Sequence, residues 1–235
     1  DGTILAWGYN QKGECDLIPN KEFVKVDAGR FHTLALRSDG SIASFGRPWE
    51  GQTTVPSPNA GFIDVAAGDD FSLAIKSTGT IIAWGLNSFN QCNVPTPNEN
   101  FKKIAAGGAH SIGLKNDTSV VCWGDNSIFQ CNVPAPNSGF TAIAAGYVHS
   151  LGLKDDTSIA AWGSNTSGQR NVPLPNTGYI AIAAGAVHSL ALRSNGTIEA
   201  WGSNSHNQLN IPSPHSNFLA RSEEHTSELQ SPNTT

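Results

Sequence analysis

The sequence is poor in charge, in methionine and in long apolar runs, and each shortage excludes a class of protein. Charged residues make up 14% of the 235 positions, and the formal net charge is −5. The chain is therefore not built to coat nucleic acid, whose phosphates require clustered Lys and Arg. No apolar run approaches the length of a membrane span, so we expect no membrane insertion. Methionine is absent even from position 1, and we expect a chain that was processed or cut from a longer one.

Motifs of known catalytic and metal sites are missing as well. The sequence has no nucleophile elbow, no phosphate-binding glycine loop, no HExxH helix and no CxxC pair. Carboxylates such as Asp69 and Asp70 have no recognisable catalytic partner. We therefore predict a protein that is not an enzyme and that needs no cofactor or metal. Because loops distant in sequence can assemble an active site, a lyase or hydrolase is kept as an alternative.

What the sequence has in abundance is glycine, proline and self-similarity. It contains 24 Gly and 13 Pro, a composition that favours many short strands. The segment DAGRFHTLALR recurs four more times in variant form, and its glycine returns every 39 residues, at Gly29, Gly68, Gly107, Gly146 and Gly185. A segment such as AWGLNSFNQCNVP follows each copy, and we call its central part, here GLNSFNQ, the WG loop. A fixed period of this kind is typical of repeat architectures.

Each repeat predicts three antiparallel strands. The first ends at AAG, the second is HSLAL with alternating apolar residues, and the third is IxAWG. Asp39-Gly40 predicts a two-residue hairpin turn, and Thr118 and Thr157, which replace the glycine in two copies, predict another turn type there. Apolar residues on both strand faces indicate blades stacked around an axis. We expect the repeat tryptophans to lie between neighbouring blades (Trp7, Trp84, Trp123, Trp162 and Trp201).

The AAGxxHSLALK…GTxxAWGxNxxGQxxVP unit closely resembles the regulator of chromosome condensation repeat in its short bacterial form. The resemblance covers residues 1–220 and implies an all-β propeller, usually of seven blades, here with three-stranded antiparallel blades. In length the repeats look most like those of secreted propellers of the β-lactamase inhibitor protein II type. Family members that exchange nucleotide on a small GTPase use longer repeats and an inserted wedge. This sequence has room for neither, so that activity is not carried over.

Seven such repeats would need about 270 residues. We therefore expect an incomplete fragment with about five and a half blades and with exposed strand edges near both ends. Residues 221–235 depart from the repeat, and RSEEHTSELQS resembles the in-frame translation of a common sequencing adapter. We interpret this segment as a non-native or disordered tail of a metagenomic fragment.

Several residue types recur at fixed repeat positions, and we expect structural roles for them. Four histidines could suggest a metal site, but no carboxylate cluster accompanies them, so we expect each to serve its own blade by hydrogen-bonding a neighbouring turn (His32, His110, His149 and His188). The cysteines are expected to be small buried thiols, because equivalent positions of adjacent blades lie too far apart for a disulfide. One basic residue ends each second strand, where we expect it to be solvated (Arg37, Lys76, Lys115, Lys154 and Arg193).

The strand directions predict where a binding surface lies. The first strand runs up to AAG, the second runs down and the third runs up to WG. The AGxxHS turns and the WG loops must therefore meet at one end of the propeller. That end carries the residues that we predict to bind a protein: Phe31, Trp49, Asp69, Asp70, Phe89, Phe129 and Tyr147. Aromatic side chains beside a few charges are typical of binding hot spots.

The sequence thus favours a non-enzymatic protein-binding module that presents variable loops on one face. A sharper alternative, suggested by the resemblance, is an inhibitor of a serine β-lactamase or penicillin-binding enzyme. The expected partner is another protein, not a nucleic acid, and the expected location is secreted or at the surface of a bacterium.

Overall fold

The computed structural model describes residues 2–6, 10–13, 15, 16, 21–212 and 218. Within them lie fifteen strands and no helix, and hence no helix that could cross a membrane. The predicted tail, residues 221–235, and Trp7 lie outside the described residues. The strands are β1 Phe23–Ala28, β2 His32–Arg37, β3 Ile42–Gly46, β4 Phe62–Ala67, β5 Phe71–Lys76, β6 Ile81–Gly85, β7 Phe101–Ala106, β8 His110–Lys115, β9 Val120–Gly124, β10 Phe140–Ala145, β11 His149–Lys154, β12 Ile159–Gly163, β13 Tyr179–Ala184, β14 His188–Arg193 and β15 Ile198–Gly202.

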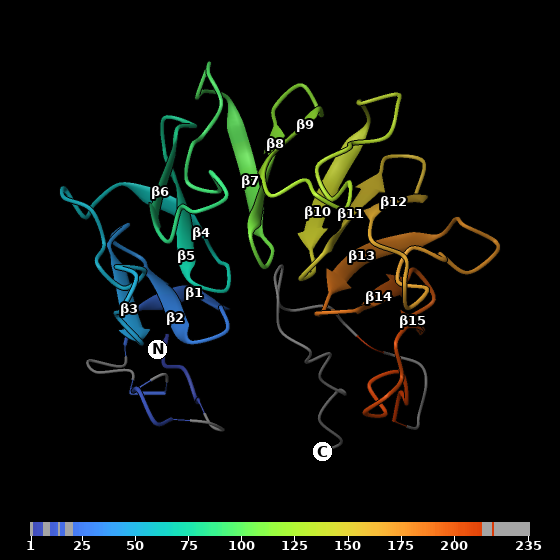
Figure 1. The fold of residues 1–235 in the computed structure, drawn as a ribbon, viewed down its shortest axis with the longest axis horizontal. Helices are drawn as coiled ribbons and strands as arrows, with labels where there is room; N and C mark the ends of the chain where they lie inside the picture. Colours follow the sequence, from blue (N-terminus) through green and yellow to red (C-terminus); the bar gives the residue numbers. More distant parts are fainter. Residues whose placement is uncertain (1, 7–9, 14, 17–20, 213–217, 219–235) are drawn as a thin grey trace.

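The strands form five separate sheets of three, each made of strands consecutive in sequence. All pairs are antiparallel. Figure 1 shows the sheets as blades around a common axis, with the first strand of each blade innermost. The predicted all-β propeller of three-stranded antiparallel blades is confirmed. We number the blades 1 to 5 along the chain, from β1–β3 to β13–β15.

The hairpin between the second and third strands differs from the prediction. Gly40 N donates to Arg37 O at 3.0 Å, and Arg37 N donates to Ser41 O at 2.8 Å. These bonds close a three-residue loop in which only Gly40 has a positive φ, of 77°. This is a type I turn followed by a left-handed residue, not the two-residue turn predicted from Asp39-Gly40.

The two threonine copies use the same turn, so the prediction of another turn type was wrong. Thr118 and Thr157 have φ of 69° and 66°, which costs about 1–3 kcal/mol for a residue other than glycine. Their hydroxyls offset part of this cost. Thr118 Oγ1 accepts from Gly139 N at 2.9 Å, and Thr157 Oγ1 accepts from Gly178 N at 2.8 Å.

The hydrophobic core lies between consecutive blades. Trp123 of blade 3, for example, packs with Leu73 and Ile81 of blade 2. The four described repeat tryptophans are all buried in such interfaces, as predicted (Trp84, Trp123, Trp162 and Trp201). Three of them also donate Nε1–H to the backbone oxygen of a glutamine in the preceding blade's WG loop, as Trp84 does to Gln52 at 2.8 Å. Trp162 Nε1 has no such partner among the described residues.

The repeat histidines join neighbouring blades. His32 Nε2 lies 2.9 Å from Ser72 Oγ of blade 2, and the pairs His110–Ser150 and His149–Ser189 have the same distance. The structural role was predicted correctly, but the partner belongs to the next blade and not to the histidine's own. Ser72 gives its one proton to Gln52 O at 2.8 Å, so it accepts the proton of His32 Nε2. Burial lowers the pKa of His32 to about 4, and the ring is neutral at pH 7.

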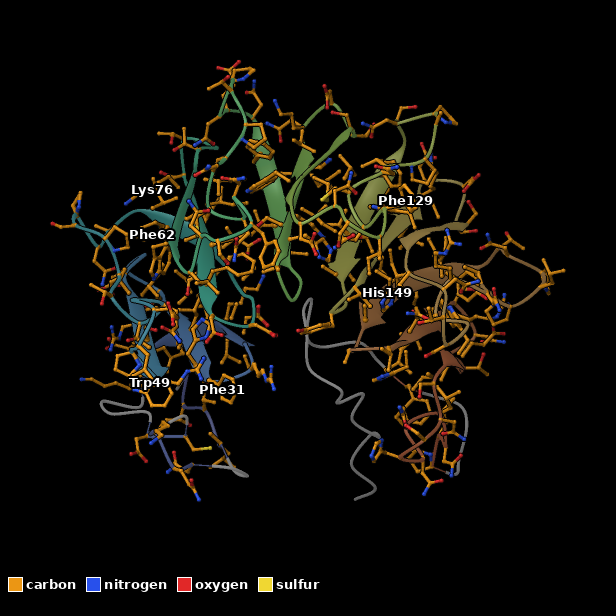
Figure 2. The ribbon with its side chains drawn as sticks, viewed as in Figure 1. Phe31, Trp49, Phe62, Lys76, Phe129 and His149 are labelled. Carbon is orange, nitrogen blue, oxygen red and sulfur yellow. A yellow bond between two sulfur atoms is a disulfide. The ribbon has the colours of Figure 1, made fainter. Side chains whose placement is uncertain are left out.

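The basic residues that end the second strands are not simply solvated. Lys76 Nζ lies 3.6 Å from the centre of the Phe62 ring, and the other four stack in the same way on the first aromatic of their own blade (Figure 2). Lys76 also donates to Pro58 O at 3.0 Å. The cation is therefore held at the edge of the blade by a cation–π contact and by hydrogen bonds.

Candidate functional site

Two classes of loop meet at one end of the propeller, as the strand directions predicted. Arg47 N donates to Phe31 O at 2.8 Å, and Leu86 N donates to Asp70 O at 2.9 Å, which joins each WG loop to the AGxxHS turn of its own blade. At the other end, Ile42 N donates to Asn59 Oδ1 at 2.8 Å. We call the first end the loop face: the turns at 29–31, 68–70, 107–109, 146–148 and 185–187, and the WG loops at 46–52, 85–91, 124–130, 163–169 and 202–208.

A buried glutamine and an asparagine at the loop base hold most of the WG loops in one conformation. Gln91 is 1% exposed, and its Oε1 accepts from Phe89 N at 2.9 Å. Asn87 Oδ1 accepts from Cys92 N at 2.9 Å across the base of the same loop. Other WG loops repeat these bonds. The side chains at the loop tips are therefore presented by a rigid frame, which lowers the entropy lost when they bind.

Four of the predicted site residues are exposed aromatic rings. The exposed fractions are 66% for Trp49, 51% for Phe89, 65% for Phe129 and 47% for Tyr147. They are all the strongly exposed aromatic side chains of the described residues, and all lie on the loop face. Phe31, Asp69 and Asp70 are half-buried. The predicted residues do not form one cluster: Trp49 and Phe31 lie together at blade 1, while Phe129 lies across the arc at blade 3 (Figure 2).

At blade 1, cations alternate with aromatic rings. The guanidinium carbon of Arg47 lies 3.9 Å from the centre of the Phe31 ring and 4.8 Å from that of Trp49. Arg30 packs against Phe31 at 4.9 Å, and Lys12 Nζ lies 5.4 Å from the Trp49 ring. We call these five residues the cation–aromatic cluster. Sequence analysis singled out its rings but missed its three cations.

Two carboxylates fix this cluster to blade 2. Asp70 pairs with Arg47 and accepts from Gln52 Nε2 at 3.2 Å. Asp69 Oδ2 lies 3.7 Å from Arg30 NH1. Burial raises the pKa of Asp69 to about 6, although Arg30 opposes the shift. Each carboxylate thus bridges two blades at the loop face.

Three members of this cluster, Phe31, Arg47 and Trp49, differ in kind from the residues at the same repeat positions of most other described blades. At the position of Arg47, the other described blades have Leu, Asp or Ser. At the position of Trp49, they have Ser or Thr. Asp70 stands where three other blades have Ala or Val. Random drift would scatter such departures over the propeller. Here they converge from separate segments, and because only the folded chain reveals this convergence, sequence reasoning could not identify Arg30 and Arg47.

Phe129 is a second departure from the repeat. Its φ is 65°, at a loop position that Gly51, Asn90, Gly168 and Asn207 also hold with positive φ. A bulky residue is an outlier in this region, and the exposed Phe129 ring gains little from packing. A strained and exposed ring is a candidate for function.

The loop that carries Phe129 is closed by a disulfide. Cys122 in β9 and Cys131 just after the loop are bonded, with Cα atoms 5.0 Å apart. The prediction of buried thiols was therefore wrong for this pair, because it compared positions between blades and not within one repeat. Cys92 is a free thiol as predicted, although it is half-buried and not fully buried, and burial raises its pKa to about 11.

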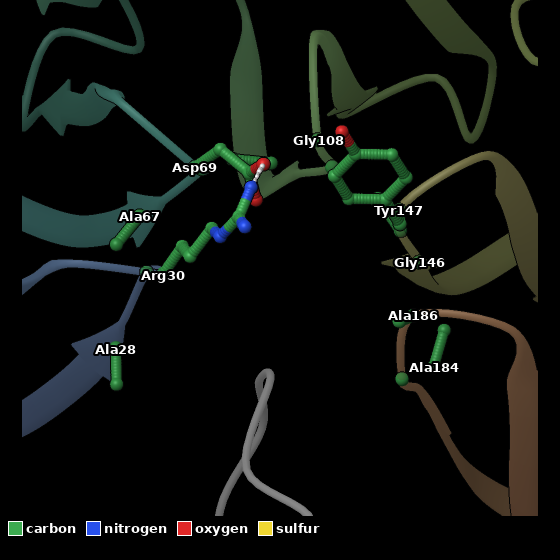
Figure 3. A pocket seen from close by; sticks show the side chains of 15 residues that line it. Ala28, Arg30, Ala67, Asp69, Gly108, Gly146, Tyr147, Ala184 and Ala186 are labelled. Carbon is green, nitrogen blue, oxygen red and sulfur yellow. Dashed lines mark ion pairs between the residues drawn. The ribbon is translucent and has the colours of Figure 1, made fainter. Parts of the chain in front are cut away.

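The AGxxHS turns also line an open cavity of about 570 Å³ around the propeller axis (Figure 3). Ala and Gly from each of the five blades form most of its wall. The residue after each glycine completes the lining and differs in every blade: Arg30, Asp69, Gly108, Tyr147 and Ala186. We call this cavity the channel mouth.

Comparison with known families identifies the repeat. The model of the regulator of chromosome condensation (RCC1) repeat matches residues 23–52, 62–91, 101–129, 140–169 and 179–208, more than half of the chain. A search of curated protein sequences finds no match.

Solved structures of similar fold include proteins from a fungus and from plants. The ectodomain of the Physcomitrella patens receptor kinase CR4 is 25% identical with a TM-score of 0.70, over 84% of this chain and 55% of that one. Saccharomyces cerevisiae Prp20p is 22% identical with a TM-score of 0.68, over 80% and 59%. The CRINKLY WD40 ectodomain of the Arabidopsis thaliana receptor kinase ACR4 is 24% identical with a TM-score of 0.65, over 83% and 70%. The chain thus spans less than two thirds of the length of the first two proteins.

Proposed function

This chain belongs to the regulator of chromosome condensation repeat family, and from that premise we propose that it is a non-enzymatic module that binds another protein through its loop face. The observation that carries the proposal is the convergence of off-pattern residues in the cation–aromatic cluster. Trp and Arg are the residues most enriched in binding hot spots. Here Arg47 already stacks on Phe31 and Trp49 before any partner arrives, so little side-chain freedom is lost on binding.

The fold suits such a role. Prp20p, which shares it, is described by its binding to Gsp1p and histones, so a propeller of this kind can present a protein-binding surface. The partner of this chain must be defined by its own loops. No feature of the described residues favours β-lactamase inhibition or an enzymatic activity, and neither is proposed.

The disulfide supports a companion proposal about location. Disulfides persist in oxidising compartments, so Cys122–Cys131 favours a secreted or cell-surface protein. Alkylation of free thiols in freshly lysed source cells tests this. Recovery of the two cysteines as one oxidised peptide supports secretion, and recovery of both as alkylated thiols contradicts it.

The binding proposal is tested with a face variant and an opposite-end control. The face variant is Trp49→Ala/Phe89→Ala/Tyr147→Ala. The control is Leu174→Ala, which removes an 88% exposed apolar side chain at the other end of the propeller. Proteins captured by the wild type from source extracts are identified, and their affinities for all three forms are measured. We expect the face variant to lose more than tenfold in affinity with an unchanged melting temperature, and the control to bind as the wild type does. Loss of binding in the control but not in the face variant would refute the proposal.

A further inference from the structure

The channel mouth has a constant wall and a variable rim. The glycines of its wall cannot change, because a Cβ at Gly29 would lie 2.7 Å from the His32 ring and one at Gly107 would lie 2.2 Å from the His110 ring. The repeat therefore allows no side chain at these glycine positions of the wall. The residue after each glycine varies from blade to blade, and among these Arg30, Asp69 and Tyr147 carry polar groups. These three side chains set the chemistry of the cavity.

Arg30 reaches from the end of β1 into the opening, with Asp69 beside it and Tyr147 on the other side (Figure 3). Its side chain is 59% exposed. The Phe31 ring at 4.9 Å and Asp69 at 3.7 Å hold its direction, but 3.7 Å exceeds a hydrogen-bond distance. The guanidinium is thus oriented, and it can still donate N–H groups to an acceptor that enters the cavity.

We infer that the channel mouth is a binding site for a carboxylate group, with Arg30 as its anchor. A planar guanidinium matches a carboxylate through two parallel hydrogen bonds. A doubly charged anion fits less well, because Asp69 and Asp70 lie close by. A volume of about 570 Å³ is within the range of sites that enclose a small ligand. It can hold an acidic side chain or the end of a peptide.

The inference deepens the proposed function and rests on it in one respect: we assign the carboxylate to the protein partner. The channel mouth lies on the same loop face as the cation–aromatic cluster, and Arg30 belongs to both. An inserted Asp, Glu or C-terminal residue would anchor the partner at the axis, while the rings contact its surface.

Asp69 makes the site dependent on pH. The charged groups around this carboxylate are Arg30 and Arg47, which stabilise its ionised form, and Asp70, which opposes it. Burial outweighs the two cations and raises the pKa of Asp69 to about 6. Above that pH the ionised Asp69 competes for Arg30, and below it Asp69 is neutral. Carboxylate binding should therefore strengthen as the pH falls from 7.5 to 5.

The test is an NMR titration of the full chain with the peptide N-acetyl-Gly-Gly. Its carboxyl group stays ionised at pH 5, because the pKa of an α-carboxyl is about 3.3–3.7. We expect resonances of the channel mouth to shift and saturate, with several-fold tighter binding at pH 5 than at pH 7.5. The neutral N-acetyl-Gly-Gly-amide should not bind. Arg30→Gln should weaken binding at least tenfold, while Arg170→Gln, an exposed arginine outside the cavity, should leave it unchanged.

Asp69→Asn separates the role of Asp69 from other effects of low pH on the protein. This variant should bind the peptide as tightly at pH 7.5 as the wild type does at pH 5. Equal binding of the amide, unchanged binding by Arg30→Gln, or an unaltered pH dependence in Asp69→Asn would each overturn the inference. Acetate separates the two sources of a carboxylate: tighter binding of the peptide supports a protein source, and tighter binding of acetate contradicts it. Because no partner is used, failure here leaves the capture experiment on the face variant as an independent test of the proposed function.

Discussion

At the scale of single residues, the buried histidines connect structure to pH. His32 is 1% exposed and donates to Ser72 across a blade interface. Its folded-state pKa of about 4 lies below the value of about 6.5 in an unfolded chain. The unfolded state therefore binds the proton first as the pH falls. Stability due to this residue is present above pH 6.5 and is lost progressively down to pH 4.

His32→Phe tests this linkage with a residue that the repeat itself provides, since Phe71 fills the same position in blade 2. We expect the wild type to lose about 2 kcal/mol more than His32→Phe between pH 7 and pH 4.5. Urea unfolding at both pH values measures this difference. Equal losses in the two proteins would show that His32 is not protonated on unfolding.

Phe129 gives a prediction that separates stability from binding. Phe129→Asn introduces the residue that blade 2 has at the same position, Asn90. Asn90 has a φ of 63°, and asparagine adopts this left-handed conformation with little strain. We expect a gain of about 1 kcal/mol in the free energy of unfolding and, if Phe129 contacts the partner, a loss of affinity. Phe89→Asn is the control, because Phe89 has no positive φ and its replacement should not stabilise the chain. A destabilised Phe129→Asn would show that the ring packs and is not strained.

Single residues also mark the limit of sequence reasoning. The aromatic site residues could be chosen because they break the repeat pattern, and the structure places four of them in solvent. The cations Arg30 and Arg47 could not be chosen in that way without knowing that turns 30–31 and 69–70 and loop 47–49 meet in space. The turn type at Thr118 was predicted wrongly for a related reason, since the hydrogen-bond partner of its hydroxyl, Gly139, is 21 residues away.

At the scale of the element, each blade is a three-stranded sheet that one glutamine links to the next. Gln52 O accepts from both Ser72 Oγ and Trp84 Nε1 of blade 2 at 2.8 Å. Periodicity predicted the strands and the burial of the tryptophan. It did not predict the bulge at the start of each first strand, which turns residues such as Val24 and Ile63 outward, where they are 64% and 52% exposed.

Within the described part of the chain, Trp162 lacks the indole hydrogen bond that Trp84 makes, so a comparison of the two measures the contribution of this bond to stability. Trp84→Phe removes ring area and the bond to Gln52 O, whereas Trp162→Phe removes similar area and no bond among the described residues. We expect Trp84→Phe to cost about 1 kcal/mol more than Trp162→Phe in the free energy of unfolding. Phe45 shows that the position accepts phenylalanine. Equal costs would mean that the indole bond contributes nothing net.

At the scale of the whole molecule, the propeller is a chain of nearest-neighbour interfaces. Every extensive contact between blades joins consecutive blades, and four of the five hydrophobic clusters are each built around one such interface. The 39-residue period was enough to predict the blade order and which loops share an end, because strand direction alone decides both. It could not predict the channel mouth, whose lining comes from five turns that are adjacent only once the blades surround an axis.

This organisation makes a prediction about additivity. Trp84 lies between blades 1 and 2, and Trp201 lies between blades 4 and 5, in separate clusters. The effects of Trp84→Phe and Trp201→Phe should therefore add to within about 0.5 kcal/mol, as expected for distant sites. Trp84→Phe and Ser72→Ala share the acceptor Gln52 O, and their coupling should exceed that value. The four proteins of each double-mutant cycle are unfolded in urea, with the m-value checked for two-state behaviour. If the distant pair coupled as strongly as the adjacent pair, stability would be shared around the propeller and the nearest-neighbour description would fail.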